Sequence, residues 1–314
     1  MICLLLGVPD PARDRLVRAV PDGRFLAPDE VADDERAAVD AAFLWDFRDR
    51  SIDQLLGRFP EIRWVHVGSA GVDHVLGPEI QRRGILISNS AGVFDQAVAE
   101  YVMALVLAHA KGLLETAAAQ AARRWAYRET RRIGGMTMVV LGAGRIGGAI
   151  AAAAAAAGLR VSGVRRSAAA PSGAFESIVA IDALDTVLPA ADYVVLALAA
   201  TPATVGLMDA RRLARLKPSA YLVNVARASV LDTAALVKAL GAGRLAGAAL
   251  DVHDEEPLPA DSPLWAVPNL FVSPHMAGDA NGWEDRVVDG FLDNFRRHRA
   301  REPLATPIDP TRGY

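Results

Sequence analysis

Three residues in the second half of the chain have side chains that could together handle a proton and an anion: Arg227, Glu256 and His275. A histidine titrates near neutral pH, and a carboxylate beside it would favour the imidazolium and fix its tautomer, which suits a general acid. An arginine offers a planar fork to a carboxylate and a positive charge to a developing alkoxide. We therefore expect His275 to donate a proton and Arg227 to hold an anionic substrate.

The elements that must position these side chains are predicted strands. Each of the three residues comes at or just past the end of one. The strands are expected at 220–225, 247–252 and 270–273. In an open α/β sheet, ligands bind outside the carboxyl ends of the strands. The sequence therefore predicts that the three side chains share one edge of a sheet.

A glycine turn follows an earlier buried strand that begins at Met136. Its residues read Gly142-Ala-Gly144-Arg-Ile-Gly147, and a helical stretch comes next. In a strand–turn–helix context this G-x-G-x-x-G pattern indicates dinucleotide binding. Gly142 permits the tight turn, Gly144 lets backbone approach a pyrophosphate, and Gly147 lets the helix pack closely. The pyrophosphate would lie on the N–H groups at the helix N-terminus.

The residues at the end of the next strand bear on the choice of dinucleotide. About twenty residues after such a turn, an NAD site has an acid that accepts the ribose 2′-hydroxyl. This chain has Arg165, Arg166 and Ser167 there. Two guanidinium groups can bind a phosphate, and the serine adds a donor. We expect a preference for NADPH, with NADH also possible.

Composition limits the class of protein. With 314 residues the chain is long enough for two domains, and 52% hydrophobic against 23% charged residues is typical of a globular protein. The net charge of −3 gives no electrostatic reason to expect nucleic acid or an anionic membrane as partner. The one cysteine, Cys3, allows no internal disulfide. No stretch is predicted to span a membrane, and we expect a cytoplasmic location.

Strand-like and helix-like segments alternate along the whole chain, which predicts parallel sheets covered on both faces. Further strands are expected at 1–7, 41–45, 64–67, 84–89, 159–164, 177–181 and 193–197. A long helix or a bent pair is expected over 96–122. The basic segment 123–132 is interpreted as a solvated or interface surface, with a role in binding a substrate anion left open. Two α/β domains result, and a cleft between domains is where a small substrate is expected to bind.

Several motifs in this order resemble the D-isomer-specific 2-hydroxyacid dehydrogenase family, over nearly the whole chain. The matching pieces are Gly142–Gly147, Asn224–Arg227, Gly247–Val252 with Glu256-Pro257, Ser273–His275, Val67–Asp73 and Ala99-Glu100. The resemblance implies two doubly wound parallel-sheet α/β domains. A flavodoxin-like substrate domain would comprise residues 1–96 and 285–314, and a Rossmann NAD(P)-binding domain would comprise residues 97–284. It also implies a homodimer joined through the cofactor domains.

The resemblance implies roles for individual residues. His275 would protonate the substrate carbonyl oxygen, Glu256 would hydrogen-bond His275, and Arg227 would clamp a 2-keto acid with help from the backbone at Ala70 and Gly71. The positions matching the family's cofactor contacts are Gly142, Gly144, Arg145, Ile146, Gly147, Arg165, Arg166, Ser167, Thr204, Val225, Ala226 and Asp251. No metal site is expected, because His253 has no second ligand at suitable spacing.

Among members of the family, the chain looks most like the NADPH-dependent glyoxylate/hydroxypyruvate reductases. This implies reduction of a small 2-keto acid to the D-2-hydroxy acid, with hydride from NADPH. Trp45 is a candidate wall of the substrate pocket, because it follows an early strand. An alternative is a bulkier 2-keto acid, if Trp45, Phe47 and Phe94 leave room. A non-catalytic dinucleotide sensor resembling the family's corepressors is the alternative from another class.

Overall fold

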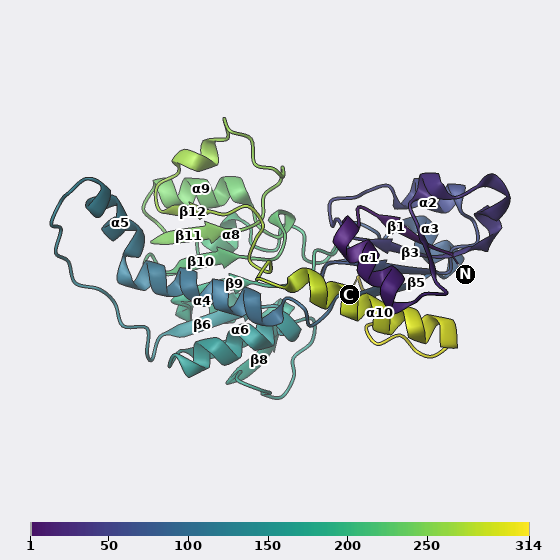
Figure 1. The fold of residues 1–314 in the computed structure, drawn as a ribbon. Coiled ribbons are helices and arrows are strands. Elements are labelled where there is room, and N and C mark those ends of the chain that lie inside the picture. Colours follow the sequence, from purple (N-terminus) through teal and green to yellow (C-terminus); the bar gives the residue numbers. More distant parts are fainter. Residues whose placement is uncertain (1, 314) are drawn as a thin grey trace. The chain divides into compact units, whose positions relative to one another are not determined.

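A computed structural model of the chain describes residues 2–313 and divides into two compact units (Figure 1). Unit 1 consists of Met1–Phe94 with Ala280–Tyr314, and unit 2 consists of Asp95–Asp279. Each unit contains one sheet whose strands all run parallel, and each sheet has its own hydrophobic core. Because parallel strands need crossover connections, helices separate most of them along the chain.

The sheet of unit 1 has five strands in the order β2-β1-β3-β4-β5. They are β1 (Ile2–Leu6), β2 (Arg24–Leu26), β3 (Val39–Leu44), β4 (Trp64–Val67) and β5 (Leu86–Asn89). The order 2-1-3-4-5 is that of the flavodoxin-like doubly wound fold. The prediction of four of these strands is confirmed, whereas β2 was not predicted.

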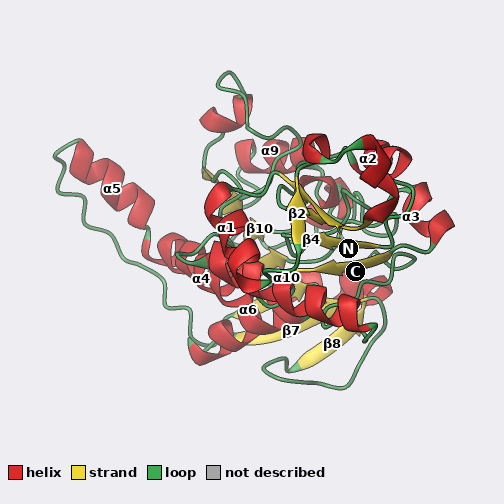
Figure 2. Ribbon diagram, turned by 45° about the vertical axis from the view of Figure 1, so that its right-hand side comes forward, coloured by secondary structure: helices red, strands yellow, loops and turns green. Residues whose placement is uncertain are grey.

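The helices of unit 1 cover this sheet. They are α1 (Asp10–Ala19), α2 (Ile52–Arg58), α3 (Pro78–Arg83) and α10 (Trp283–Ala300). The last of these comes from the C-terminal part of the chain and lies beside α1 (Figures 1 and 2). Its Phe291 stacks on Phe43 of β3 and Trp64 of β4, with ring centroids 4.3 and 5.6 Å apart. Aromatic burial of this kind fastens α10 to the sheet.

The sheet of unit 2 has seven strands in the order β12-β11-β10-β9-β6-β7-β8. They are β6 (Thr137–Leu141), β7 (Arg160–Arg165), β8 (Ser177–Ala180), β9 (Tyr193–Leu196), β10 (Tyr221–Asn224), β11 (Gly247–Leu250) and β12 (Leu270–Val272). Counted along the unit, the order from β8 is 3-2-1-4-5-6-7, which is the Rossmann order with one added strand. The strand order reverses between β6 and β9, so ligands are expected at the carboxyl ends of these two strands.

The helices of unit 2 begin with a bent pair. They are α4 (Asp95–Lys111), α5 (Leu113–Ala121), α6 (Arg145–Ala156), α7 (Leu184–Val187), α8 (Ala210–Leu213) and α9 (Thr233–Gly241). The first two meet at Gly112, whose φ of +56° is left-handed, and the chain bends there by 65°. Of the two alternatives predicted for 96–122, the bent pair is therefore confirmed.

Short 3₁₀ helices complete the two units. They lie at Pro28–Glu30, Asp33–Ala38, Ile181–Ala183, Leu188–Ala190, Ala228–Val230 and Pro263–Ala266. Over residues 2–313, no single helix is long and apolar enough to cross a membrane, and α4 with α5 meet that length and composition only as the bent pair. The apolar side of α4 packs in the core of unit 2, where α4 lies against α6.

Candidate active site

Three neighbouring strands of unit 2 bring the predicted catalytic residues to one edge of the sheet. In the register of the sheet Asn224 of β10 pairs with Leu250 of β11, and Leu250 pairs with Val272 of β12. The three strands therefore end level with one another. Arg227 and His275 each follow three residues after such an end, and Glu256 follows on the loop that leaves β11.

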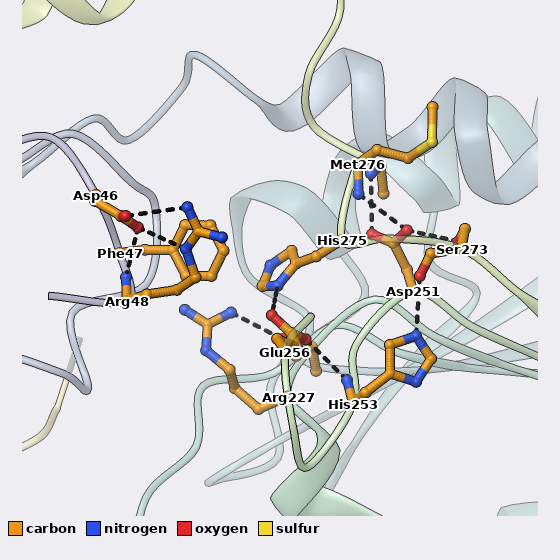
Figure 3. Close-up of polar contacts among 12 residues, drawn as sticks. Asp46, Phe47, Arg48, Arg227, Asp251, His253, Glu256, Ser273, His275 and Met276 are labelled. Carbon is orange, nitrogen blue, oxygen red and sulfur yellow. Dashed lines mark hydrogen bonds and ion pairs between the residues drawn. The ribbon is translucent and has the colours of Figure 1, made fainter. Parts of the chain in front are cut away.

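His275 and Glu256 are in direct contact. Nδ1 of His275 lies 2.8 Å from Oε2 of Glu256, and Figure 3 shows the imidazole turned toward the carboxylate. Burial would raise the pKa of Glu256, but hydrogen bonds from His275 and from the backbone of His253 outweigh it and lower that pKa. Because the ionised carboxylate can only accept, Nδ1 must carry the proton of this bond. The second nitrogen, Nε2, is then the one that can exchange a proton with another molecule.

The turn that carries Arg227 is fixed by a buried asparagine. The side-chain oxygen of Asn224 accepts the N–H of Ala226 at 3.0 Å, and its amide nitrogen donates to the carbonyl of Arg227 at 3.1 Å. The guanidinium of Arg227 donates from Nη1 to the carbonyl of Ala226 at 2.9 Å. These bonds hold the backbone and the side chain of Arg227 in one orientation at the end of β10.

A second carboxylate, Asp251, supports the loop that carries His275. Asp251 follows β11 directly and is only 2% exposed. Its two oxygens accept the hydroxyl of Ser273 at 2.6 Å and the backbone N–H groups of Met276 at 3.1 Å and Ala277 at 2.9 Å (Figure 3). The prediction made Asp251 a cofactor contact, and these bonds to the loop that carries His275 were not anticipated from the sequence.

The glycine turn has the close approaches that its sequence predicts. Gly142 has a φ of +107°, and an added Cβ would lie 2.3 Å from the carbonyl oxygen of Ala197, beside β9. A Cβ on Gly147 would lie 1.9 Å from the carbonyl oxygen of Gly142. A Cβ on Gly144 would meet nothing within 4 Å, so this side of the turn is open. The turn stands where the strand order of the sheet reverses.

The helix after the turn can bind an anion. Gly144 is the N-cap of α6, and it provides no side chain to satisfy the first N–H groups of this 12-residue helix. Such groups, with the positive end of the helix dipole, suit a pyrophosphate. Arg145, the first residue of α6, forms an ion pair with Asp95 at 3.2 Å. The open turn and the uncapped helix therefore fit the dinucleotide that the sequence predicts.

Arg165, Arg166 and Ser167 lie next to the glycine turn. The N–H groups of Gly142 and Ala143 both donate to the carbonyl of Val164, at 2.8 and 3.0 Å. Arg165, the last residue of β7, comes immediately after that carbonyl, and all three predicted residues are exposed. Two positive charges therefore stand at the end of the strand that neighbours the turn.

The remaining predicted cofactor contacts lie at other strand ends of unit 2. Thr204 is buried in the loop after β9, and its hydroxyl donates to the carbonyl of Ala199 at 2.7 Å. Val225 follows β10 and donates its N–H to the last residue of β9 at 3.1 Å, and Ala226 comes next. Ile146 is half-buried in the first turn of α6.

Unit 1 holds the remaining predicted substrate residues. Asn89 donates its side-chain amide to the carbonyl of Ala70 at 2.6 Å, which fixes the loop after β4. Gly71 accepts the hydroxyl of Ser69 at 2.7 Å. Trp45 follows β3, and its ring lies 5.5 Å from that of Trp283, the first residue of α10. The sequence did not predict a role for Trp283. It lies far from Trp45 along the chain, and only the fold brings the two rings together.

Two hydrogen bonds join His253 to its neighbours, while its Nδ1 is buried without a partner among the described residues. Its Nε2 donates to the carbonyl of Ser273 at 2.9 Å, since a carbonyl oxygen can only accept. Its backbone N–H donates to Glu256 at 2.8 Å. Within residues 2–313, no group of three or more histidine, cysteine, aspartate or glutamate side chains is arranged to hold a metal ion.

Comparison with known proteins identifies the family. Residues 103–277 match the family model described as "D-isomer specific 2-hydroxyacid dehydrogenase, NAD binding domain". This match covers more than half of the chain, and it spans the glycine turn together with Arg227, Glu256 and His275.

Relatives match over most of their length. The glyoxylate/hydroxypyruvate reductase B of Citrobacter koseri is 33% identical over 311 residues, which are 94% of this chain and 93% of the relative. The D-isomer specific 2-hydroxyacid dehydrogenase of Xanthobacter autotrophicus, solved with NADPH and MES, is 33% identical with a TM-score of 0.85, over 100% of this chain and 99% of that one.

The NADPH-dependent glyoxylate/hydroxypyruvate reductase of Sinorhizobium meliloti, solved with NADP and sulfate, is 26% identical with a TM-score of 0.86 over 100% of both chains. The two units of the present chain thus have the fold of these solved proteins. The chain belongs to the D-isomer specific 2-hydroxyacid dehydrogenase family and is an NAD(P)-dependent oxidoreductase that acts on 2-keto and 2-hydroxy acids.

Proposed function

We propose that the protein reduces a small 2-keto acid of the glyoxylate or hydroxypyruvate kind to the D-2-hydroxy acid with NADPH, and that His275 is the general acid. The observation that carries this proposal is the 2.8 Å contact between His275 and Glu256 at the carboxyl edge of the sheet. The names of the relatives from C. koseri and S. meliloti support the substrate class.

His275 delivers the proton. Glu256 occupies Nδ1, so the transferable proton of the imidazolium is on Nε2. The lowered pKa of Glu256 keeps its carboxylate ionised at neutral pH, so that it accepts the N–H of Nδ1. The proton leaves Nε2 for the carbonyl oxygen of the substrate as that oxygen gains negative charge. Glu256 thus sets the tautomer of the acid.

Arg227 binds the carboxylate of the substrate. A guanidinium can form two parallel bonds to a carboxylate and also polarises a neighbouring carbonyl. The bonds from Asn224 hold the turn of Arg227 in place before substrate arrives. Backbone N–H groups at Ala70 and Gly71 would assist, and Trp45 would form one wall of the pocket.

The cofactor is held by unit 2 and supplies the hydride when bound. The glycine turn and the first N–H groups of α6 would bind its pyrophosphate, with Arg145 and Ile146 beside them. Thr204, Val225, Ala226 and Asp251 would contact the rest of the dinucleotide, as the family resemblance implies. Gly144 would be the point of closest backbone approach, because a Cβ there would project into open space.

Arg165, Arg166 and Ser167 would select NADPH. They are exposed at the end of β7, next to the turn that would bind the pyrophosphate. Two arginines attract a 2′-phosphate by charge, where an aspartate would repel it. The relatives solved with NADPH and with NADP support this choice.

The protein is proposed to form a homodimer through unit 2. Helix α5 and the segment that follows it extend away from the sheet of that unit (Figure 1). Trp125 is 100% exposed and Tyr127 is 88% exposed on this segment, and Leu113 and Leu114 are exposed on α5. Large apolar side chains grouped in this way are typical of a surface that a second copy covers.

Sedimentation velocity tests the dimer. The wild-type chain should sediment as a dimer, and the double variant Trp125→Ala/Tyr127→Ala should sediment as a monomer. Trp265→Ala is the matched control, because Trp265 is also exposed on unit 2 but lies outside the extended segment. A monomeric wild-type protein, or a double variant that stays dimeric, contradicts the proposal.

Initial-rate kinetics test the reaction. The purified protein should oxidise NADPH in the presence of glyoxylate or hydroxypyruvate, with higher kcat/KM than with pyruvate or phenylpyruvate, and the product should have the D configuration. Higher kcat/KM with phenylpyruvate would contradict the small-substrate assignment. If the protein binds NADPH but reduces none of the four acids, the proposed reaction is wrong.

A further inference from the structure

His275 has an unusual backbone conformation. Its φ is +55°, in the left-handed region. For a residue with a Cβ this conformation costs about 1–3 kcal/mol, and it persists only where the surrounding structure holds it. The residue is not glycine and is not an asparagine or aspartate whose side chain could bond its own backbone. Neighbouring groups must therefore hold the chain on both sides of His275.

Asp251 contacts the chain on both sides of His275. Before it, Oδ1 accepts the hydroxyl of Ser273 at 2.6 Å. After it, Oδ1 accepts the N–H of Met276 at 3.1 Å and Oδ2 accepts the N–H of Ala277 at 2.9 Å. One buried carboxylate thus fastens a five-residue loop whose central residue is His275, and the bonds are charge-assisted.

Ser273 is itself held by several groups. Its backbone N–H donates to Leu250 of β11 at 3.0 Å, and its carbonyl accepts Nε2 of His253 at 2.9 Å. Three bonds, to Asp251, Leu250 and His253, therefore fix the position of Ser273.

We propose that Ser273 and Asp251 are positioning residues that hold His275 in its left-handed conformation, with its imidazole against Glu256. The proposal rests on the proposed role of His275 as general acid and adds the residues through which that acid is placed. Ser273 would touch neither substrate nor cofactor in this role. Its loss should therefore reduce turnover rather than binding.

A buried serine that only satisfies neighbouring polar groups would behave differently. Loss of such a group lowers the stability of the fold, and it leaves the turnover of the folded enzyme unchanged. A positioning residue changes kcat while KM for the cofactor stays the same. It also changes the protection of the loop amides, which hydrogen exchange reports whether or not the enzyme turns over.

The test compares Ser273→Ala with Ser273→Thr, which keeps the hydroxyl. Ser177→Ala is the matched control, because Ser177 is a half-buried serine in unit 2 that bonds Ser162 at 3.0 Å, far along the chain from the loop. Each variant is assayed with NADPH and glyoxylate at a temperature where it is folded, and hydrogen exchange is followed at Met276 and Ala277.

Ser273→Ala should lower kcat by roughly tenfold to a hundredfold, the loss expected for one hydrogen bond to a charged group. KM for NADPH should stay unchanged, and the amides of Met276 and Ala277 should exchange faster. Ser273→Thr should regain most of the turnover, and Ser177→Ala should match the wild type. The proposal is wrong if kcat of Ser273→Ala equals that of Ser177→Ala, if threonine fails to restore it, or if exchange at the loop is unchanged.

These outcomes can be separated from failure of the proposed function. If His275→Ala turns over as fast as the wild type, His275 is not the general acid. The proposal that Ser273 and Asp251 position a catalytic residue is then wrong as well. Faster exchange at Met276 in Ser273→Ala would then show only that the serine holds the loop. If His275→Ala is inactive and Ser273→Ala is fully active, the proposed function stands and the positioning role is wrong.

Discussion

The backbone N–H of Gly142 donates to the carbonyl of Val164 at 2.8 Å. This bond ties the glycine turn after β6 to the end of β7, one residue before Arg165. The turn that we propose binds pyrophosphate and the strand end that carries two guanidinium groups are thereby joined through backbone alone. The cofactor preference of the protein should consequently depend on the arginines while the fold does not.

Replacing both arginines tests this separation. Arg165→Ala/Arg166→Ala should lower kcat/KM for NADPH by roughly tenfold to a hundredfold, as expected for loss of a charge-assisted contact, and should leave kcat/KM for NADH nearly unchanged. Arg160→Ala is the control, because Arg160 is exposed at the other end of the same strand, where it pairs with Glu176. If the ratio of kcat/KM for NADPH to kcat/KM for NADH is unchanged, Arg165 and Arg166 do not bind the 2′-phosphate.

Two adjacent glycines of α6 make a matched pair for the turn. Gly147→Ala would place a Cβ 1.9 Å from the carbonyl oxygen of Gly142, and backbone there cannot yield without moving the turn. Overpacking of this kind costs about 1–3 kcal/mol, so NADPH should bind at least several-fold more weakly. Gly148→Ala meets nothing within 4 Å and should stabilise the helix by roughly 0.5–1 kcal/mol. Equal NADPH affinity of the two variants by calorimetry would contradict this account.

Much of the architecture could be predicted because its signals are local. Trp64–Val67 was predicted as a strand with these bounds, which the structure confirms. The strand Arg24–Leu26 was missed because three residues of mixed burial carry no periodic pattern. Gly112 made either one long helix or a bent pair possible over 96–122. Only its left-handed φ in the structure shows that the helix is bent there.

The sequence predicted the contact between His275 and Glu256 but not the bonds that support it. His275 and Glu256 were expected to meet, and the structure brings them to 2.8 Å. The bonds between Asp251 and the backbone of Met276 and Ala277 were not predicted. A backbone N–H group is present whatever the side chain, so residue type does not indicate which of them a carboxylate will bind. Ser273 was read only as part of a motif, since the pairing of its hydroxyl with Asp251 depends on the register of β11 and β12.

Removing the imidazole tests the proposed general acid. His275→Ala should lower the rate of 2-keto acid reduction by roughly 10²- to 10⁴-fold, the range for loss of a positioned acid, with NADPH affinity largely retained. His109→Phe serves as the control, since His109 stacks on Tyr221 at 4.1 Å within the same unit and phenylalanine keeps that stacking. Steady-state rates and NADPH fluorescence titrations measure the two effects. If His275→Ala turns over as fast as His109→Phe, His275 is not the general acid.

The stability of unit 1 should depend on pH through His66. This residue is fully buried in β4, where it contacts Ser88 at 2.7 Å, and burial lowers its pKa from 6.5 to about 3. Between these two values the unfolded chain binds a proton that the folded chain does not. The free energy of unfolding should therefore fall as the pH is lowered from 6.5 toward 3, with a slope from this residue of up to about 1.4 kcal/mol per pH unit.

The variant His66→Gln isolates this dependence, because glutamine can bond Ser88 and has no charge to gain. Urea unfolding followed by tryptophan fluorescence at pH 7, 6, 5 and 4 gives the free energy of unfolding of both proteins. All other titrating groups are common to the two chains, so the difference between the curves belongs to His66. The wild type should lose stability faster than the variant below pH 6.5. Parallel curves over this range would mean that His66 is protonated in the folded protein as readily as in the unfolded chain.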